Sequence, residues 1–192
     1  MDHVKIRTAT TEDTQKLLHI YQYYVLHTAI TFEYEVPTEE EFRERIEKIS
    51  AGYPYLVAVQ DDRILGYAYA KQFVGRAAYG WSAELTIYLH PDVRKCGIGR
   101  MLYEALEQCL KEMGVLNLYA CIGYPEKEDR YLTRNSADFH AHLGFEKVGE
   151  FHKCGYKFGH WYNMIWMEKI IGDHLPKQRS IRPFTDTDRK LV

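Results

Sequence analysis

The spacing of apolar residues along the first part of the chain changes from one period to another, and each period marks a different element. Apolar and polar residues alternate over residues 3–9, which predicts a strand. After the N-cap candidates Thr10 and Thr11, apolar residues recur at helical spacing at Leu17, Leu18, Tyr21, Tyr24 and Val25. A second apolar stripe follows Thr38 and Glu41, which have the spacing of a capping box. The pattern therefore predicts a strand followed by two helices.

The rest of the chain continues as strands interrupted by two further helices. In chain order, the pattern predicts a hairpin over 53–73, a strand over 78–89, a helix over 99–113, a strand over 116–123, a helix over 135–143, and strands over 145–151 and 161–170. The resulting order, β-α-α-β-β-β-α-β-α-β-β, is typical of one mixed α/β domain. We expect this domain over residues 1–171 and a surface arm over residues 172–192, which hold two prolines and few apolar residues.

Composition and charge narrow the choice of partners. The chain is 46% hydrophobic and 27% charged, as ordinary globular domains are, and its net charge of −2 lacks the basic excess that nucleic acid binding needs. No apolar run reaches membrane-spanning length, and the first residues lack the apolar core of a signal peptide. We therefore expect a cytoplasmic protein with neither nucleic acid nor membrane as partner.

Cysteine and histidine form no pattern that indicates a metal site. The four cysteines are scattered without a CxxC pair, and free thiols are their ordinary state in a reducing cytosol: Cys96, Cys109, Cys121 and Cys154. The pairs His140 with His142 and His152 with Cys154 have no second pair at zinc-finger spacing. We expect no metal.

The stretch RKCGIGR carries the first specific chemistry in the chain. Gly97 and Gly99 stand between a predicted strand and a predicted helix, where glycine lets a backbone come close to a ligand. The unpaired amides of a helix start form an anion site, and Arg94, Lys95 and Arg100 add positive charge. This combination suits a phosphate or pyrophosphate, although it is neither a Walker A loop nor a GxGxxG fingerprint. A tight turn with surface charges is the alternative.

The pattern R-x-x-G-x-G between a strand and an amphipathic helix resembles the acetyl-CoA signature of the GNAT superfamily of N-acetyltransferases. FHAHLGF (139–145) resembles the second signature of that superfamily, a helix with a Tyr or His that leads into a Gly-Phe strand start. Five further stretches resemble the phosphinothricin acetyltransferase-like branch of the superfamily: YPYLVA (53–58), GYAYA (66–70), AYGWSAELTIYLHP (78–91), GIGRMLYEAL (97–106) and GYKFGHWYN (155–163). The resemblance covers about residues 6–169. It implies a single GNAT-type domain with a central mixed, mostly antiparallel sheet flanked by helices.

The resemblance also implies a reaction, the transfer of an acetyl group from acetyl-CoA, the co-substrate, to an amine. In the superfamily the strand before the glycine turn splays from its neighbour and pairs with the pantetheine arm, while the pyrophosphate binds at the turn. The residues that would contact acetyl-CoA are Ile87, Tyr88, Leu89, Arg94, Lys95, Cys96, Gly97, Ile98, Gly99, Arg100, Ser136 and His140.

Two residues are candidates for proton transfer. Alternation puts Glu84 on the same strand face as Thr86 and Tyr88, and Glu84 matches the position of the general base proposed for the family. The alternative for Glu84 is a half-exposed strand residue in a salt bridge. His140 stands where many members of the superfamily have a tyrosine, and it is expected to contact acetyl-CoA or to donate a proton to the departing thiolate.

The acceptor is expected to be a small-molecule amine, either an amino acid or an analogue of one. The residues expected to contact it are Phe32, Tyr79, Glu84, Tyr156 and Lys157. Phe158 and Asn163 replace a His and an Asp of the phosphinothricin enzymes, which indicates a different amine.

Two other functions stay open. One is acetylation of a protein N-terminus or lysine, and the other is a non-catalytic acyl-CoA-binding module. The habit of the family and the aromatic residues near the C-terminal strands, such as Trp161, Tyr162 and Trp166, also predict a homodimer.

Overall fold

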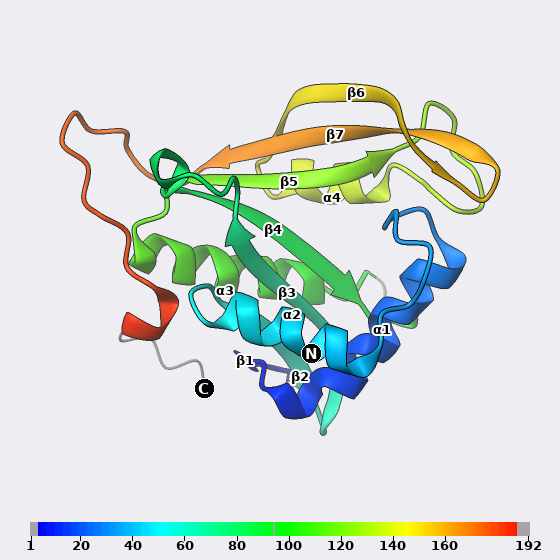
Figure 1. Ribbon diagram of the computed structural model, residues 1–192, viewed down its shortest axis with the longest axis horizontal. Helices are drawn as coiled ribbons and strands as arrows, with labels where there is room; N and C mark the ends of the chain where they lie inside the picture. Colours follow the sequence, from blue (N-terminus) through cyan, green and yellow to red (C-terminus); the bar gives the residue numbers. More distant parts are fainter. Residues whose placement is uncertain (1–3, 94, 188–192) are drawn as a thin grey trace.

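The computed structural model describes residues 4–93 and 95–187, and the strands of this part form one sheet (Figure 1). The order across the sheet is β1-β2-β3-β4-β5-β7-β6, and each neighbouring pair is antiparallel except β4 with β5. The strands are β1 (Lys5–Thr8), β2 (Tyr55–Gln60), β3 (Arg63–Gln72), β4 (Ser82–Leu89), β5 (Asn117–Tyr124), β6 (Glu146–Lys157) and β7 (His160–Ile170). The predicted order of elements and the mixed, mostly antiparallel sheet are confirmed.

Helices cover both faces of the sheet. They are α1 (Thr14–His27), α2 (Glu39–Ser50), α3 (Ile98–Met113) and α4 (Asn135–His142). Successive residues of β3 point to opposite faces, so Tyr67 packs in the same apolar cluster as Leu17 of α1, whereas Ala68 packs in the cluster that holds Leu102 of α3. We call these the α1/α2 face and the α3/α4 face. Each face has its own core.

β4 and β5 pair only at one end. Their parallel ladder runs from Ser82 opposite Asn117 to Glu84 opposite Tyr119, three pairs in strands of eight residues each. Beyond Glu84 the two strands diverge, which Figure 1 shows as a wedge between them. The divergence opens the middle of the sheet.

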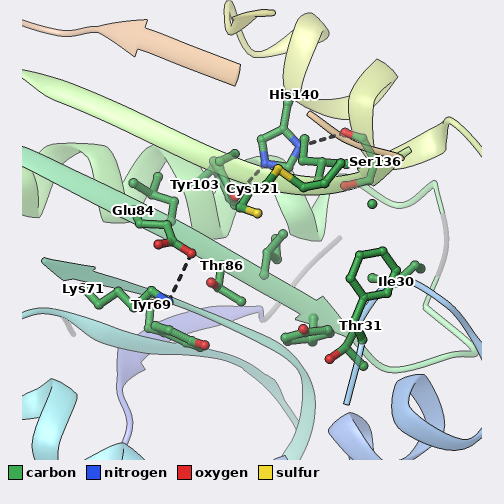
Figure 2. A pocket seen from close by; sticks show the side chains of 18 of the residues that line it. Ile30, Thr31, Tyr69, Lys71, Glu84, Thr86, Tyr103, Cys121, Ser136 and His140 are labelled. Atoms are coloured by element: carbon green, nitrogen blue, oxygen red, sulfur yellow. Dashed lines mark hydrogen bonds and ion pairs between the residues drawn. The ribbon is translucent and has the colours of Figure 1, made fainter. Parts of the chain in front are cut away.

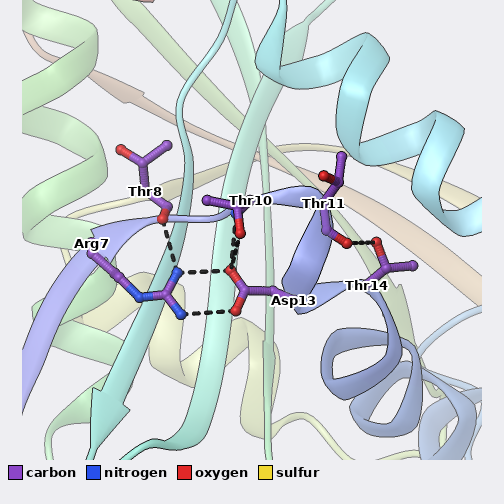
Figure 3. A network of polar contacts seen from close by, with 6 residues as sticks. All are labelled: Arg7, Thr8, Thr10, Thr11, Asp13 and Thr14. Carbon is purple, nitrogen blue, oxygen red and sulfur yellow. Dashed lines mark hydrogen bonds and ion pairs between the residues drawn. The ribbon is translucent and has the colours of Figure 1, made fainter.

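A network of polar contacts joins β1 to the residues that precede α1 (Figure 3). Arg7 of β1 donates two hydrogen bonds to Asp13, at 2.7 and 2.8 Å, and the Thr10 amide donates a third at 2.9 Å. Burial opposes the charged form of Asp13, but these three hydrogen bonds outweigh it and lower the pKa of its carboxyl. A single 3-10 turn, Thr11–Asp13, then leads into α1.

Two boundaries differ by several residues from the prediction. The residues before Ser82 are not strand, because Ala77–Tyr79 form a 3-10 turn. β6 runs six residues further than the predicted end at 151, across two irregularities in its pairing with β7. Phe158 and Gly159 make the turn between them with φ of 52° and 82°, the left-handed geometry that two-residue hairpins need. The two irregularities in the pairing of β6 with β7 interrupt the alternation of apolar and polar residues, so the sequence pattern did not show where β6 ends.

Residues 172–187 run along the outside of the domain, and hydrogen bonds hold them to it. The indole of Trp81 donates to the Arg179 carbonyl at 2.6 Å, and the Arg182 amide donates to the Met113 carbonyl at 2.9 Å. Phe184 packs at the edge of the core that α3 covers. The segment therefore holds the end of α3, away from the gap between β4 and β5.

Candidate active site

A cavity of about 520 Å³ occupies the gap between β4 and β5. It is lined from both faces of the sheet, by residues 30–32 of the α1–α2 connection on one side and by Tyr103, Ser136 and His140 on the other (Figure 2). Glu84 and Thr86 of β4 line it between the two. A ligand from one face can therefore meet a ligand from the other inside the sheet.

The β4 backbone loses its strand partner part-way along this cavity. The Phe73 amide donates to the Ser82 carbonyl, so Ser82 and each second residue after it direct their backbone groups toward β3. Leu85, Ile87 and Leu89 direct theirs to the other side, where the ladder with β5 ends at Glu84 and takes the Leu85 amide. From the Leu85 carbonyl to the Leu89 amide, this edge has no strand partner among the described residues. An extended ligand with amide groups can add itself there as one more strand, which is the geometry that a pantetheine arm requires.

The glycine turn lies next to this free edge. Lys95 and Gly97 both have left-handed backbone angles, with φ of 53° and 76°, and α3 begins at the next residue, Ile98. A Cβ atom at Gly99 would lie 3.6 Å from the Ile87 side chain, which places the start of α3 beside β4. The first amides of a helix have no partner within it, so this helix start offers an anion site close to β4.

The structure shows a second reason for glycine at position 99, besides the approach of a ligand. A Cβ atom there would lie 3.0 Å from the ring of Phe139, so a larger residue would require that ring, or the helix, to shift by a few tenths of an ångström. Arg100 is exposed and pairs with Glu104 of its own helix at 3.8 Å. Cys96 is half-buried against the core. Arg94 lies outside the described residues.

Glu84 is held by a neighbouring strand. Its Oε1 lies 3.1 Å from the ammonium of Lys71, which stands directly opposite on β3, and its side chain is 16% exposed. Burial opposes the charged form of Lys71, but Glu84 outweighs it and raises the pKa of this lysine. The salt bridge expected as the alternative for Glu84 is thus present, and it lies inside the cavity (Figure 2).

His140 is buried on the opposite side and is bonded at both ring nitrogens. Nδ1 lies 2.7 Å from the Ser136 carbonyl oxygen, which only accepts, so Nδ1 carries the proton. Burial lowers the pKa of His140 and keeps the ring neutral. Nε2 therefore accepts from the Tyr103 hydroxyl, 2.8 Å away, and it has no proton to give to a ligand.

The residues predicted to contact the amine are spread over two regions. Phe32 and Glu84 line the cavity, and the Phe32 ring lies flat against Gly155, where any side chain would collide with it. Tyr79 is 43% exposed in the turn before β4, and Tyr156 is 46% exposed beside Trp161. Neither tyrosine belongs to the cavity wall.

Lys157 is buried and fastens the connection between α1 and α2. Its ammonium donates to the carbonyl oxygens of Thr28 at 2.9 Å and Thr31 at 2.8 Å. Burial lowers the pKa of Lys157 to about 8. Tyr34 donates to the Tyr156 carbonyl from the same connection. Lys157 thus positions residues 30–32 at the cavity without reaching into it.

Several lining residues escaped the sequence analysis, and those with polar or reactive side chains include Lys71, Tyr103, Cys121 and Cys154. Tyr103 follows Gly99 by four positions, so it lies on the same face of the helix, and this spacing was a usable signal. The facing position of Lys71 depends on the register of β3 with β4, and Cys154 lies in an irregular part of β6. No local pattern shows either.

The described residues contain neither a cluster of metal ligands nor a membrane-spanning helix. No three histidine, cysteine, aspartate or glutamate side chains gather there in a way that would hold a metal ion. No helix of this part combines the length and the apolar character needed to cross a membrane.

Comparison with known proteins shows what this arrangement belongs to. A family model of the acetyltransferase (GNAT) domain matches residues 6–166. The phosphinothricin N-acetyltransferase of Streptomyces coelicolor is 34% identical over 172 residues, which are 88% of this chain and 96% of that protein. An L-amino acid N-acyltransferase of Escherichia coli is 27% identical over 168 residues, 86% of this chain and 92% of that protein.

A solved structure agrees in the fold. The phosphinothricin acetyltransferase of Sinorhizobium meliloti, in complex with acetyl-CoA, has a TM-score of 0.83 and 31% identity, covering 96% of this chain and 95% of that one. The family match extends from β1 into β7 and includes both strands that form the gap. The chain therefore belongs to the GNAT acetyltransferases and is an acetyl-CoA-dependent N-acetyltransferase.

Proposed function

We propose that the chain transfers the acetyl group of acetyl-CoA directly to the amine of a small molecule, an amino acid or an analogue of one. A bond forms between the amine nitrogen and the acyl carbon, the carbon–sulfur bond breaks, the amine loses a proton and CoA leaves as a thiol. The observation that carries this proposal is that the free edge of β4 and the Glu84 carboxylate lie in one cavity. Bound acetyl-CoA supplies the activated acyl group.

The α3/α4 face would hold acetyl-CoA. The Leu85 carbonyl, the Ile87 backbone and the Leu89 amide would pair with the pantetheine arm, and one of the two amides would stabilise the negative charge that develops on the thioester oxygen. The turn would hold the pyrophosphate through the amides near Gly97 and the charge of Lys95. The Tyr24 hydroxyl donates to the Leu89 carbonyl at 2.6 Å and so fixes the end of the strand.

The amine would enter from the α1/α2 face, between Phe32 and Glu84, and Glu84 would take its proton. Lys71 bonds Oε1 of Glu84, and Oε2 has no hydrogen-bond partner among the residues that the structure describes. Free α-amines titrate near about 8, so a carboxylate is a sufficient base when it acts directly or through one water. An amine placed toward Leu89, five residues or about 16 Å along the strand, would need water as the carrier.

Direct attack is supported by the state of one of the two thiols that line the cavity. Cys121 of β5 lines the cavity, and burial, with Glu84 nearby, raises the pKa of its thiol to about 11. A protonated thiol is a poor nucleophile, so an acetyl-cysteine step is disfavoured at neutral pH.

His140 would act as a positioning residue. Because its Nδ1 proton is bound to the Ser136 carbonyl, it holds the Tyr103 hydroxyl at the cavity wall through Nε2. The departing thiolate then takes its proton from solvent, because the Tyr103 hydroxyl donates its only proton to His140. His140 would therefore act through Tyr103 and not as the proton donor.

The class of amine is supported by the relatives and by the shape of the cavity. One relative is a phosphinothricin N-acetyltransferase and another an L-amino acid N-acyltransferase. The cavity is lined on the α1/α2 face by residues 30–32, which Lys157 holds in place. An acceptor site that lies within the sheet suits a small amine better than a protein segment.

A panel of amines tests this function. CoA release is measured with acetyl-CoA and each of the amino acids, methionine sulfone, phosphinothricin, a lysine-containing peptide and an N-terminal peptide. We expect turnover with at least one free amino acid or analogue and none with the peptides. Turnover confined to peptides would indicate protein acetylation. Tight acetyl-CoA binding with no turnover in any case would indicate a binding module.

We also propose a homodimer through the outer side of the β6–β7 hairpin. β6 is the edge strand of the sheet, and Phe151 and Trp161 are 55% and 60% exposed there, which is unusual for large apolar side chains. Of the other aromatics expected in the interface, Tyr162 is buried and Trp166 is half-buried against Phe73. Sedimentation should give twice 22.6 kDa at micromolar concentration, and Trp161→Asp should shift it to the monomer. A monomeric wild type would contradict the proposal.

A further inference from the structure

A second cavity of about 530 Å³ adjoins the first and takes no part in the reaction described above. It lies between α2 and the part of the sheet that carries Glu84, on the α1/α2 face. Tyr69, Lys71 and Tyr88 line both cavities, so a ligand can extend from one into the other.

Aromatic rings make up most of the wall of this second cavity. The tyrosines that line it are Tyr21, Tyr53, Tyr55, Tyr67, Tyr69 and Tyr88. The rings of Tyr55 and Tyr69 are stacked with centroids 4.8 Å apart, and those of Tyr67 and Tyr69 lie within 9° of parallel. Such a wall offers flat apolar surface and hydroxyl groups together, which suits an aromatic ring.

The rings of two of these tyrosines are buried, but their hydroxyl groups are not. Tyr55 is 2% and Tyr67 is 1% exposed, yet among the described residues Ser50 Oγ is the only buried side-chain oxygen or nitrogen without a hydrogen-bond partner. Burial raises the pKa of both tyrosines well above the ordinary value, so they remain neutral donors. Because both tyrosines line the cavity, a ligand or water there can bond their hydroxyl groups.

Lys71 connects this cavity to the chemistry. It lies 3.1 Å from Glu84 and lines both cavities. An amino acid with its amine at Glu84 has its carboxylate one or two atoms away, within reach of the Lys71 ammonium. The carboxylate would draw Lys71 from Glu84 and leave both oxygens of the base free. The side chain would then continue past Tyr69 into the second cavity.

We propose that the acceptor is an aromatic amino acid, or a close analogue, with its ring in the tyrosine-lined cavity and its carboxylate on Lys71. This inference rests on the proposed function and narrows its substrate class. It follows from the joining of the two cavities at Lys71 and from the tyrosine rings that line the second one.

Acceptors that differ by one group test the proposal. Phenylalanine, tyrosine and tryptophan are compared with alanine, which lacks the ring, and with phenethylamine, which lacks the carboxylate. We expect kcat/KM for the aromatic amino acids to exceed that for alanine on the order of 10- to 100-fold, as burial of one aromatic side chain provides. Phenethylamine should lose mainly kcat, because Lys71 then stays on Glu84. Equal or higher kcat/KM for alanine would overturn the proposal.

A variant that fills the cavity gives an independent readout. Ile49 lines the second cavity from α2 and is half-buried, so Ile49→Trp puts an indole where the ligand ring would lie. The ratio of kcat/KM for phenylalanine to that for alanine should fall about 10-fold. Tyr23→Phe, on α1 and outside both cavities, is the control and should leave the ratio unchanged. An unchanged ratio in Ile49→Trp would show that the cavity holds water only.

Failure of this proposal and failure of the proposed function can be separated. If non-aromatic amino acids are acetylated and aromatic ones are not, the function stands and this inference is overturned. If no amine is acetylated, the function fails, and calorimetry with N-acetylphenylalanine still decides the cavity. Binding by wild type that Ile49→Trp weakens about 10-fold supports an aromatic site, and no binding by wild type overturns it.

Discussion

The two faces of the gap between β4 and β5 are built in opposite ways. On the α3/α4 face, the turn that contains Lys95 and Gly97 and the start of α3 are consecutive residues. On the α1/α2 face, Phe32, Lys71 and Glu84 come from a connection and two strands, and each is positioned by contacts with distant segments. The first face is a local motif, whereas the second is a product of the tertiary fold.

This difference teaches where specificity can change. A local turn that binds the common part of acetyl-CoA can stay constant while the other face varies, because the two meet only inside the cavity. We therefore expect substitutions on the α3/α4 face to alter the affinity of the protein for acetyl-CoA, whichever acceptor is used. Changes on the α1/α2 face should alter turnover and the choice of amine. The predictions below test that division.

The largest effect is expected for Glu84→Gln. The substitution keeps the size of the side chain and removes its basicity, and a positioned base contributes roughly 10²- to 10⁴-fold in rate. Turnover should fall by that factor while acetyl-CoA affinity is retained. The remaining activity should rise with pH, as the amine loses its proton to solvent. Steady-state kinetics and calorimetry measure the two quantities separately.

Two comparisons protect this result. Glu44→Gln, at an exposed position of α2, is the matched control and should behave as wild type. Single-turnover measurements remove the case in which slow product release hides a chemical defect. Turnover by Glu84→Gln within about twofold of wild type would show that Glu84 only pairs with Lys71.

The next effect is expected at the two glycines. Gly97→Val forces a β-branched residue into left-handed geometry, and Gly99→Val puts side-chain atoms against the Phe139 ring. An L-residue in that geometry costs about 1–2 kcal/mol, so acetyl-CoA should bind about 5- to 30-fold more weakly to Gly97→Val. Gly99→Val should weaken binding by displacing α3 from α4. Gly75→Ala, where a Cβ meets nothing within 4 Å, is the control.

Calorimetry with acetyl-CoA measures all three glycine variants. Unchanged affinity in both valine variants would remove the turn from the binding site. Loss of selectivity among amines with unchanged acetyl-CoA affinity would contradict the division of labour between the two faces.

The sequence predicted the parts of the molecule that depend on neighbouring residues. The helix that begins at Ile98 and the turn before it follow from glycine, charge and apolar period within some twenty residues. The same holds for the strand alternation that puts Glu84 and Tyr88 on one face. These features need no knowledge of which strand pairs with which.

The remaining parts depend on register and on contacts between distant segments. Lys71 meets Glu84 only because β3 pairs with β4 in one particular register. Lys157 was predicted at the amine, but it bonds the carbonyls of Thr28 and Thr31 instead. A sequence pattern gives the face of a residue and not its partner, so these positions could not be derived from it.

A smaller effect is expected for His140→Gln. If His140 orients Tyr103 and donates no proton itself, the loss in kcat should stay within about tenfold, below that of Glu84→Gln. Burial lowers the pKa of His140 below its ordinary value of about 6.5, so its charge should change little between pH 7.5 and 8.5. The pH–rate profiles of wild type and variant should therefore run parallel over that range. An alkaline limb in wild type that disappears in the variant would show proton donation.

The smallest effect is expected in the segment that closes the α1/α2 face. Lys157→Met removes two hydrogen bonds to the α1–α2 connection together with a buried charge, and the two effects oppose each other. At pH 7 the variant should differ little from wild type in thermal midpoint, while KM for the amine rises because residues 30–32 are less well held. Lys16→Met, at an exposed position of α1, is the control.

The pH dependence of that stability gives the sharper test of Lys157. Burial lowers its pKa to about 8 in the folded protein, whereas an unfolded lysine titrates at about 10.4. Between these values the unfolded chain binds more protons than the folded one, so the free energy of unfolding contributed by Lys157 rises with pH. Below pH 8 the burial penalty is complete. Burial raises the pKa of Tyr55 and Tyr67, so their contribution to the free energy of unfolding falls once the pH passes about 10. The useful range is therefore about pH 7.5–9.5. Over that range the thermal midpoint of wild type should gain on that of Lys157→Met, and a constant difference would show that Lys157 keeps an ordinary pKa and does not hold the acceptor face as a buried cation.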